Sequence, residues 1–174
     1  MKLTTKVILM IGALSMAACT NAGKLGGGAG DGAFDPNAAG NSGVIAGSAS
    51  DPASTAYFQE AVGDRVTFEV DQSSLSAVGR ATLDGQATWL LTNADYTAII
   101  EGHADEQGTR EYNIALGNRR ADSARSYLVS KGVPSSRMQI VSYGKERPIE
   151  ICSEEACYAK NRRAVTVLAG GLTG

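Results

Sequence analysis

Apolar and polar residues follow regular spacings from about residue 56 to the end of the chain. In residues 65–70 the two kinds alternate, so that Val66, Phe68 and Val70 share one face, as a half-buried strand requires. Three further segments fit strands by the same criteria, namely residues 96–101, 138–144 and 163–169. The pattern therefore predicts four strands.

Helical spacing occupies the segments between these strands. Residues 76–93 are predicted to form one helix, whose candidate core residues are Val78, Leu83, Trp89 and Leu90. Residues 110–130 form a second, with Thr109 as its N-cap and Gly132 just beyond its end, and residues 153–162 form a short third. Strands that alternate with helices predict an α/β fold, in which a small sheet is covered on one face by two main helices.

The chain begins with a short basic stretch and an apolar run of about a dozen residues, which is too short to cross a membrane. Small residues then precede Cys19, so residues 1–18 are predicted to be a signal peptide. The segment resembles a bacterial lipoprotein signal, with Met16 where Leu is usual, and this implies that Cys19 carries the lipid. The alternative is an ordinary secretory peptide with an incidental Cys. Thr20 in place of an Asp favours the outer membrane.

Residues 19–55 are rich in Gly, Ala, Asn and Ser and have few large apolar side chains. Such a segment buries too little apolar surface to offset the entropy of ordering it. We predict a flexible tether, with a root-mean-square span of roughly 30–35 Å, between Cys19 and a domain at residues 56–174. The alternative is a loose loop packed on that domain.

The charge of the chain and its counts of His and Cys argue against some classes of function. With 16 basic and 18 acidic residues the net charge is −2, which argues against nucleic acid as a partner. One His and three Cys are too few for a usual structural zinc site, and no cofactor is implied. In an exported protein Cys152 and Cys157 are predicted to form a local disulfide, with two free thiols as the alternative.

The densest polar cluster, residues 101–128, runs from a strand end through a loop into the long helix. Ligands in α/β folds lie at such strand ends. Asp105 on the loop could approach Arg120 on the helix. Held apart by a small ligand, the two would bind a zwitterion, the carboxylate taking the ammonium and the guanidinium the carboxyl group. A direct structural ion pair between them is the alternative.

Three colinear segments of the chain carry a wider resemblance. GHADEQGTREYNIALGNRRA, VSYGKERP and AKNRRAV resemble the peptidoglycan-associated lipoproteins of the OmpA-like domain family, over roughly residues 62–168. The resemblance implies an OmpA-like βαβαβ(α)β sandwich with a small mixed sheet. It also implies that Asp105 and Arg120 hold the ammonium and carboxylate of meso-diaminopimelate in the stem peptide of peptidoglycan, which favours the clamp over the ion pair.

The same resemblance implies further site residues around this clamp. Asn113 and Leu116 match a polar residue and an apolar wall residue of the family's helix, and Gln107 stands where the family often has Arg. Val70 and Asp71 match residues that line the site after the first strand.

These inferences predict an outer-membrane lipoprotein, on the periplasmic face, that is not an enzyme. The resemblance implies that it binds peptidoglycan non-covalently and tethers the membrane to the wall as part of the Tol-Pal system, with TolB as a protein partner. No nucleophile elbow such as GxSxG supports a wall hydrolase. The remaining alternative is an OmpA-like structural module of another envelope machine, with a partner-protein interface in place of wall binding.

Overall fold

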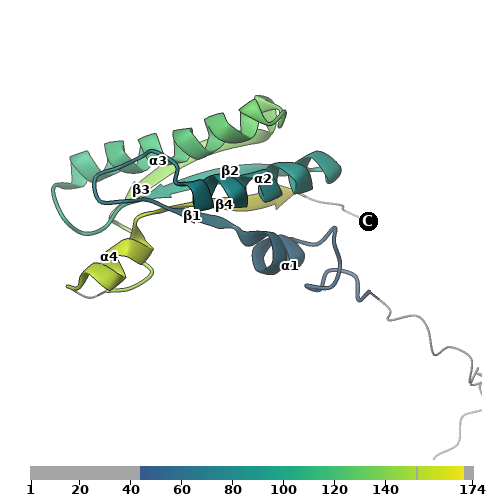
Figure 1. Cartoon of the computed structure of the whole chain (residues 1–174), viewed down its shortest axis with the longest axis horizontal. Helices are drawn as coiled ribbons and strands as arrows, with labels where there is room; N and C mark the ends of the chain where they lie inside the picture. Colours follow the sequence, from purple (N-terminus) through teal and green to yellow (C-terminus); the bar gives the residue numbers. More distant parts are fainter. Residues whose placement is uncertain (1–43, 152, 171–174) are drawn as a thin grey trace, which may run out of the picture. The chain divides into compact units, whose positions relative to one another are not determined.

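The computed structural model describes residues 44–151 and 153–170 (Figure 1). The predicted signal peptide, Cys19, most of the predicted tether and Cys152 lie outside the described residues. Within the described ranges, no helix combines the length and the apolar character needed to cross a membrane.

Four strands form one sheet in the order β1-β4-β2-β3. They are β1 (Arg65–Thr67), β2 (Tyr96–His103), β3 (Met138–Gly144) and β4 (Arg163–Gly170). Strand β4 is antiparallel to both of its neighbours, whereas β2 and β3 are parallel. The predicted mixed sheet is therefore confirmed.

The first strand is shorter than the alternation predicted. It ends at Thr67, although the next N–H, of Phe68, still donates to the carbonyl of Arg162 at 2.9 Å. Phe68 is buried, but Val70 is 55% exposed and does not share the buried face, because the chain has already turned into the loop after β1. Asp71 in this loop has φ of 55°, the left-handed region that few residues other than Gly adopt.

Two long helices cover one face of the sheet, as predicted. They are α2 (Ala77–Thr92) and α3 (Arg110–Ser130), which lie on the same side in Figure 1. Ser76 and Thr109 cap their N-termini by accepting the N–H groups of Gly79 and Tyr112. The shorter helical segments are α1 (Thr55–Tyr57), η1 (Phe58–Gly63), η2 (Ser135–Arg137) and α4 (Glu155–Asn161).

The core lies between the two helices and the sheet. Leu83, Trp89 and Leu90 of α2 are buried in it, as predicted, and α3 contributes Leu128. Val78 is 77% exposed, so its prediction as a core residue is wrong. It lies five residues before Leu83, which turns its side chain about 140° around the helix from the buried stripe.

Helix α3 approaches β2 closely at two glycines. A Cβ atom on Gly102 would lie 1.8 Å from the carbonyl oxygen of Gly117. No side chain fits between the two backbones at this point, so the pair fixes the first half of α3 against the end of β2.

Contacts with the sheet domain begin before residue 56. The indole Nε1 of Trp89 donates to the carbonyl of Pro52 at 2.7 Å, and the hydroxyl of Tyr96 donates to that of Ala53 at 3.0 Å. The last residues of the segment predicted as a tether therefore pack against the domain.

Candidate functional site

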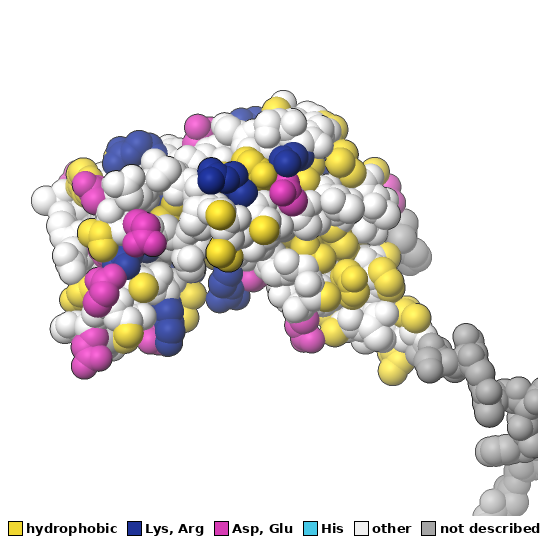
Figure 2. All heavy atoms as spheres, in the orientation of Figure 1, with side chains coloured by type: hydrophobic (Ala, Val, Ile, Leu, Met, Phe, Trp, Pro, Cys, Tyr) yellow, Lys and Arg dark blue, Asp and Glu magenta, His cyan; other side chains and the backbone are white. Residues whose placement is uncertain are grey.

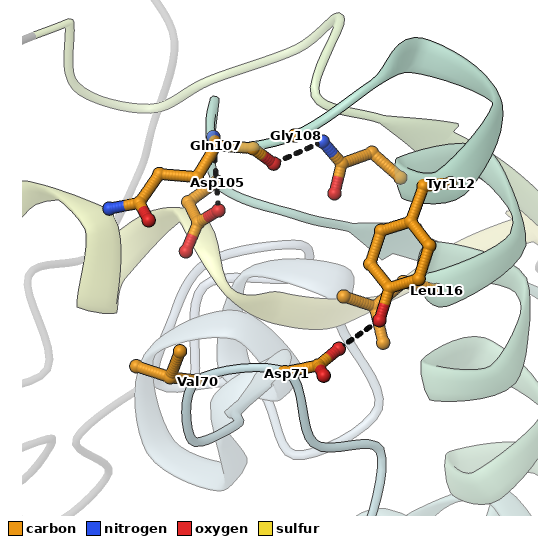
Figure 3. A pocket seen from close by; sticks show the side chains of 8 residues that line it. Val70, Asp71, Asp105, Gln107, Gly108, Tyr112 and Leu116 are labelled. Carbon is orange, nitrogen blue, oxygen red and sulfur yellow. Dashed lines mark hydrogen bonds between the residues drawn. The ribbon is translucent and has the colours of Figure 1, made fainter.

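A cavity of about 280 Å³ opens between the loop after β1, the loop after β2 and the first turns of α3 (Figure 3). Six of the seven residues predicted for peptidoglycan binding line it. They are Val70, Asp71, Asp105, Gln107, Asn113 and Leu116. Gly108 and Tyr112 complete the lining. The structure thus brings together residues from three separate parts of the sequence.

Asp105 lines this cavity and is 9% exposed. Its Oδ1 accepts the N–H of Gln107 at 3.2 Å, and its Oδ2 lies 3.2 Å from Nη1 of Arg162. The preceding residue, Ala104, is tied to β3 through its N–H, which donates to the carbonyl of Gly144. These bonds fix the orientation of the Asp105 carboxylate.

Arg162 is a residue whose role the sequence analysis missed. The pattern of the NRR segment suggests a solvated rim, yet the Arg162 side chain is 3% exposed and Arg163 is also buried. Arg162 donates to the carbonyl of Phe68 and pairs with Glu155 of α4 as well as with Asp105. Burial opposes its charge, but the two carboxylates outweigh that effect and raise the pKa of Arg162.

Arg120 lies behind the cavity and not in its lining. It is fully buried and donates to three backbone carbonyls, those of Gln72, His103 and Glu69, at 2.8, 2.8 and 3.2 Å. The carboxylate of Asp105 is bonded to Arg162, so the direct ion pair between Asp105 and Arg120 is not formed. Burial lowers the pKa of Arg120 to about 10, which leaves it charged at neutral pH.

Asp71 and Tyr112 meet across the cavity. The hydroxyl of Tyr112, at the start of α3, donates to Oδ1 of Asp71 on the loop after β1 (Figure 3). This bond, more than any other influence, raises the pKa of Tyr112. No local pattern in the sequence indicates the partner of Tyr112, because Tyr112 and Asp71 are 41 positions apart.

The loop after β2 is shaped by its own polar contacts. The side-chain amide of Asn113 donates to the carbonyl of Gln107 at 2.7 Å, and Nζ of Lys145 donates to that of Gly108 at the same distance. Gly108 has φ of 90°, which a residue with a side chain rarely adopts. The loop therefore holds Gln107 at the cavity in a defined conformation.

The cavity lining carries negative charge. Its eight residues include two carboxylates and no Lys or Arg, while Val70 and Leu116 supply apolar walls. Glu155, the acidic residue of α4, is exposed and pairs with Arg162, and Figure 2 shows acidic side chains at that end of the domain with Lys and Arg side chains among them. The arrangement suits a ligand with a positive group next to an aliphatic chain.

Cys157 of α4 takes part in a disulfide. Its predicted partner, Cys152, lies outside the described residues, so the pairing of the two stays a prediction.

Comparison with known proteins agrees with this fold and site. A profile of the OmpA family matches residues 67–162, a range that spans all the residues lining the cavity. The chain belongs to the OmpA family. This membership confirms the predictions of an OmpA-like domain and of a protein that is not an enzyme.

Individual relatives indicate a narrower class of protein than the family profile does. A peptidoglycan-associated lipoprotein of Rhizobium meliloti is 48% identical over 164 residues, which cover 94% of this chain and 87% of the relative. One from Pseudomonas aeruginosa is 42% identical over 161 residues, covering 87% of this chain and 90% of the relative. The resemblance to the peptidoglycan-associated lipoproteins is thereby confirmed.

Solved structures confirm the fold. The crystal structure of the peptidoglycan-associated lipoprotein from Burkholderia pseudomallei matches with a TM-score of 0.63 at 36% identity and covers 68% of this chain and 100% of that one. The C-terminal domain of Helicobacter pylori MotB matches with a TM-score of 0.58, over 62% of this chain and 85% of that one, but at 19% identity it shares the fold alone.

Proposed function

We propose that the chain binds peptidoglycan non-covalently through the meso-diaminopimelate of the stem peptide. The observation that carries this proposal is the cavity lined by Asp71 and Asp105, in an OmpA-family domain whose relatives are named peptidoglycan-associated lipoproteins. Meso-diaminopimelate has an aliphatic chain that carries a free ammonium and carboxylate at one end. Its ammonium matches the carboxylates of the cavity, and its aliphatic chain matches the apolar walls.

In this proposal Asp105 accepts the ammonium group. Its two contacts in the structure, with Gln107 and Arg162, leave lone pairs on each carboxylate oxygen. Leu116 and Val70 flank the methylene chain, and Asn113 and Gln107 border the loop side of the ligand.

Arg120 has two tasks in this proposal. Three of its five N–H groups hold the backbone of the loop after β1 and of His103, and the other two are available for the ligand carboxylate. Because Arg120 is fully buried, the carboxylate would reach it only from the cavity side, beyond Leu116, one helical turn away.

The lipoprotein relatives imply a membrane-anchored protein of the cell envelope. We propose, more specifically, that lipid on Cys19 anchors the chain in the outer membrane and that residues 20–55 reach from it toward the wall. The domain would then link membrane and wall on the periplasmic face, as part of the Tol-Pal system and with TolB as a partner. No bond is made or broken in this function.

A pull-down with insoluble peptidoglycan sacculi tests the proposal. Full-length protein in detergent should sediment with the sacculi, and Asp105→Ala should remain in the supernatant. Asp122→Ala, which removes an exposed carboxylate elsewhere on α3, is the matched control and should sediment like the wild type. If the wild type does not sediment, or if Asp105→Ala sediments equally well, wall binding by this cavity is refuted. The alternative, an envelope module with a protein interface, would then come first.

A further inference from the structure

Tyr112 and Asp71 bridge the cavity from opposite sides. Tyr112 belongs to the first turn of α3, whereas Asp71 lies on the loop after β1, and both line the cavity. Apart from the hydrogen bond between Tyr112 and Oδ1 of Asp71, Oδ2 of Asp71 has no partner among the described residues. One oxygen is thus held by the helix, and the other is available to a ligand (Figure 3).

The backbone of the loop that carries Asp71 is fixed by Arg120, but the Asp71 side chain is not. A φ of 55° is unfavourable for a residue with a side chain, although Asp tolerates it better than most. The loop is fixed from behind by Arg120, which donates to the carbonyls of Glu69 and Gln72. Arg120 holds only the backbone of the loop, so the direction of the Asp71 side chain depends on Tyr112.

We propose that Tyr112 is a positioning residue of the ligand site, whose hydroxyl holds the Asp71 carboxylate across the cavity so that Oδ2 faces the ammonium of the ligand. The inference rests on the proposed function and assigns a second carboxylate to the same ammonium that Asp105 accepts. Preorganised in this way, Asp71 loses little side-chain entropy when the ligand binds.

A second tyrosine on the same helix provides a matched comparison. The hydroxyl of Tyr127 donates to Oδ1 of Asp84 at 3.0 Å, the same type of bond between α3 and another segment, but neither residue lines the cavity. If the bond at Tyr112 contributed only to folding, the loss of either tyrosine hydroxyl should affect stability alike and leave ligand binding unchanged.

Calorimetry with a stem peptide that contains meso-diaminopimelate tests this inference on the full-length protein in detergent. Tyr112→Phe should weaken binding about fivefold, and Asp71→Asn, which tolerates the same φ, about tenfold. The double variant should bind no more weakly than Asp71→Asn alone, since Tyr112 acts through Asp71. Tyr127→Phe should bind like the wild type, and its midpoint of thermal unfolding should match that of Tyr112→Phe.

Two results would overturn the inference while leaving wall binding intact. One is that Tyr112→Phe binds as tightly as the wild type; the other is that the losses in the double variant multiply, which would mean that the two residues act independently. If the wild type itself does not bind the peptide, the proposed function fails together with this inference, so the two failures are distinguishable.

Discussion

His103 is a titratable residue buried beside the site. It is 1% exposed at the end of β2, and its ring lies 5.6 Å from that of Tyr143. Neither ring nitrogen has a hydrogen-bond partner within the described part of the chain, because the Glu101 carboxylate, 3.5 Å from Nε2, does not meet hydrogen-bond geometry. Burial, with the charges of Arg163 and Arg147, lowers the pKa of His103 to about 4. The imidazole is therefore neutral at pH 7, and its contact with Glu101 is not an ion pair.

This burial predicts a pH dependence of stability. The pKa of His103 is about 4 in the folded state and near 6.5 when unfolded, so the unfolded chain binds more protons between these values. Stability contributed by the neutral ring is complete above pH 6.5 and falls by about 3 kcal/mol as the pH drops to 4. Urea unfolding at pH 7, 5.5 and 4 should show a smaller loss for His103→Gln than for the wild type. Equal losses of stability in the wild type and in His103→Gln would contradict the lowered pKa of His103.

Arg162 is predicted to matter for stability as well as for the site. Arg162→Gln leaves the nearly buried Asp105 without its ion pair and should lower the free energy of unfolding by about 3 kcal/mol. Arg119→Gln, an exposed arginine of α3, should change it by less than about 0.5 kcal/mol. Chemical denaturation of both variants is the measurement. Similar stabilities would show that the pair between Arg162 and Asp105 contributes nothing.

At the scale of elements, the site depends on how closely α3 approaches the sheet. Gly102→Ala would place a methyl group against the backbone of Gly117, which cannot retreat without moving α3, and should destabilise the domain by about 3 kcal/mol or more. Gly85→Ala, in α2, meets only Val62 at an ordinary 3.5 Å and should stabilise by about 0.5–1 kcal/mol, since Ala favours helices. Thermal unfolding of the two variants should shift in opposite directions, and a neutral Gly102→Ala would refute the close packing.

How far the sequence predicts these elements depends on the range of the interactions that form them. The long helix α3 is marked by a local N-cap and a terminal glycine, so its bounds were predicted correctly. The apolar alternation of strand β1 continues to residue 70, but the strand ends at Thr67, which pairs with Arg163, the first residue of β4. Local spacing does not contain that information.

The residues of the site also divide into those with local partners, which the sequence indicates, and those with distant partners, which it does not. Asp105 and Arg120 stand out because they lie near each other in the sequence, on a strand-end loop and the following helix. Arg162 and Tyr112 do not, since their partners Asp105 and Asp71 are 57 and 41 residues away. The resemblance to a family supplied six of the eight residues that line the cavity, and only the fold reveals Tyr112 and the arginine that contacts Asp105.

At the scale of the whole molecule, the proposed function requires an anchor at one end and a wall-binding site at the other. Cys19→Ala removes the only proposed site of lipid attachment and should release the protein from the membrane fraction, with loss of labelling by radioactive palmitate. Sacculus binding by the released protein should be unchanged, because the cavity lies in the domain. Retention of the label in Cys19→Ala would contradict the anchor.

Calorimetry of the full-length protein with a stem peptide that contains meso-diaminopimelate tests directly whether the cavity binds this ligand. Wild type, Asp105→Asn and Arg120→Lys are compared after circular dichroism has shown that each is folded. We expect saturable binding by the wild type, loss of binding in Asp105→Asn, and at least about a tenfold weakening in Arg120→Lys, which keeps the charge but loses the bidentate fork. A wild type that gives no binding heat, or an Asp105→Asn variant that binds as tightly as the wild type, would contradict binding of the ligand by this cavity.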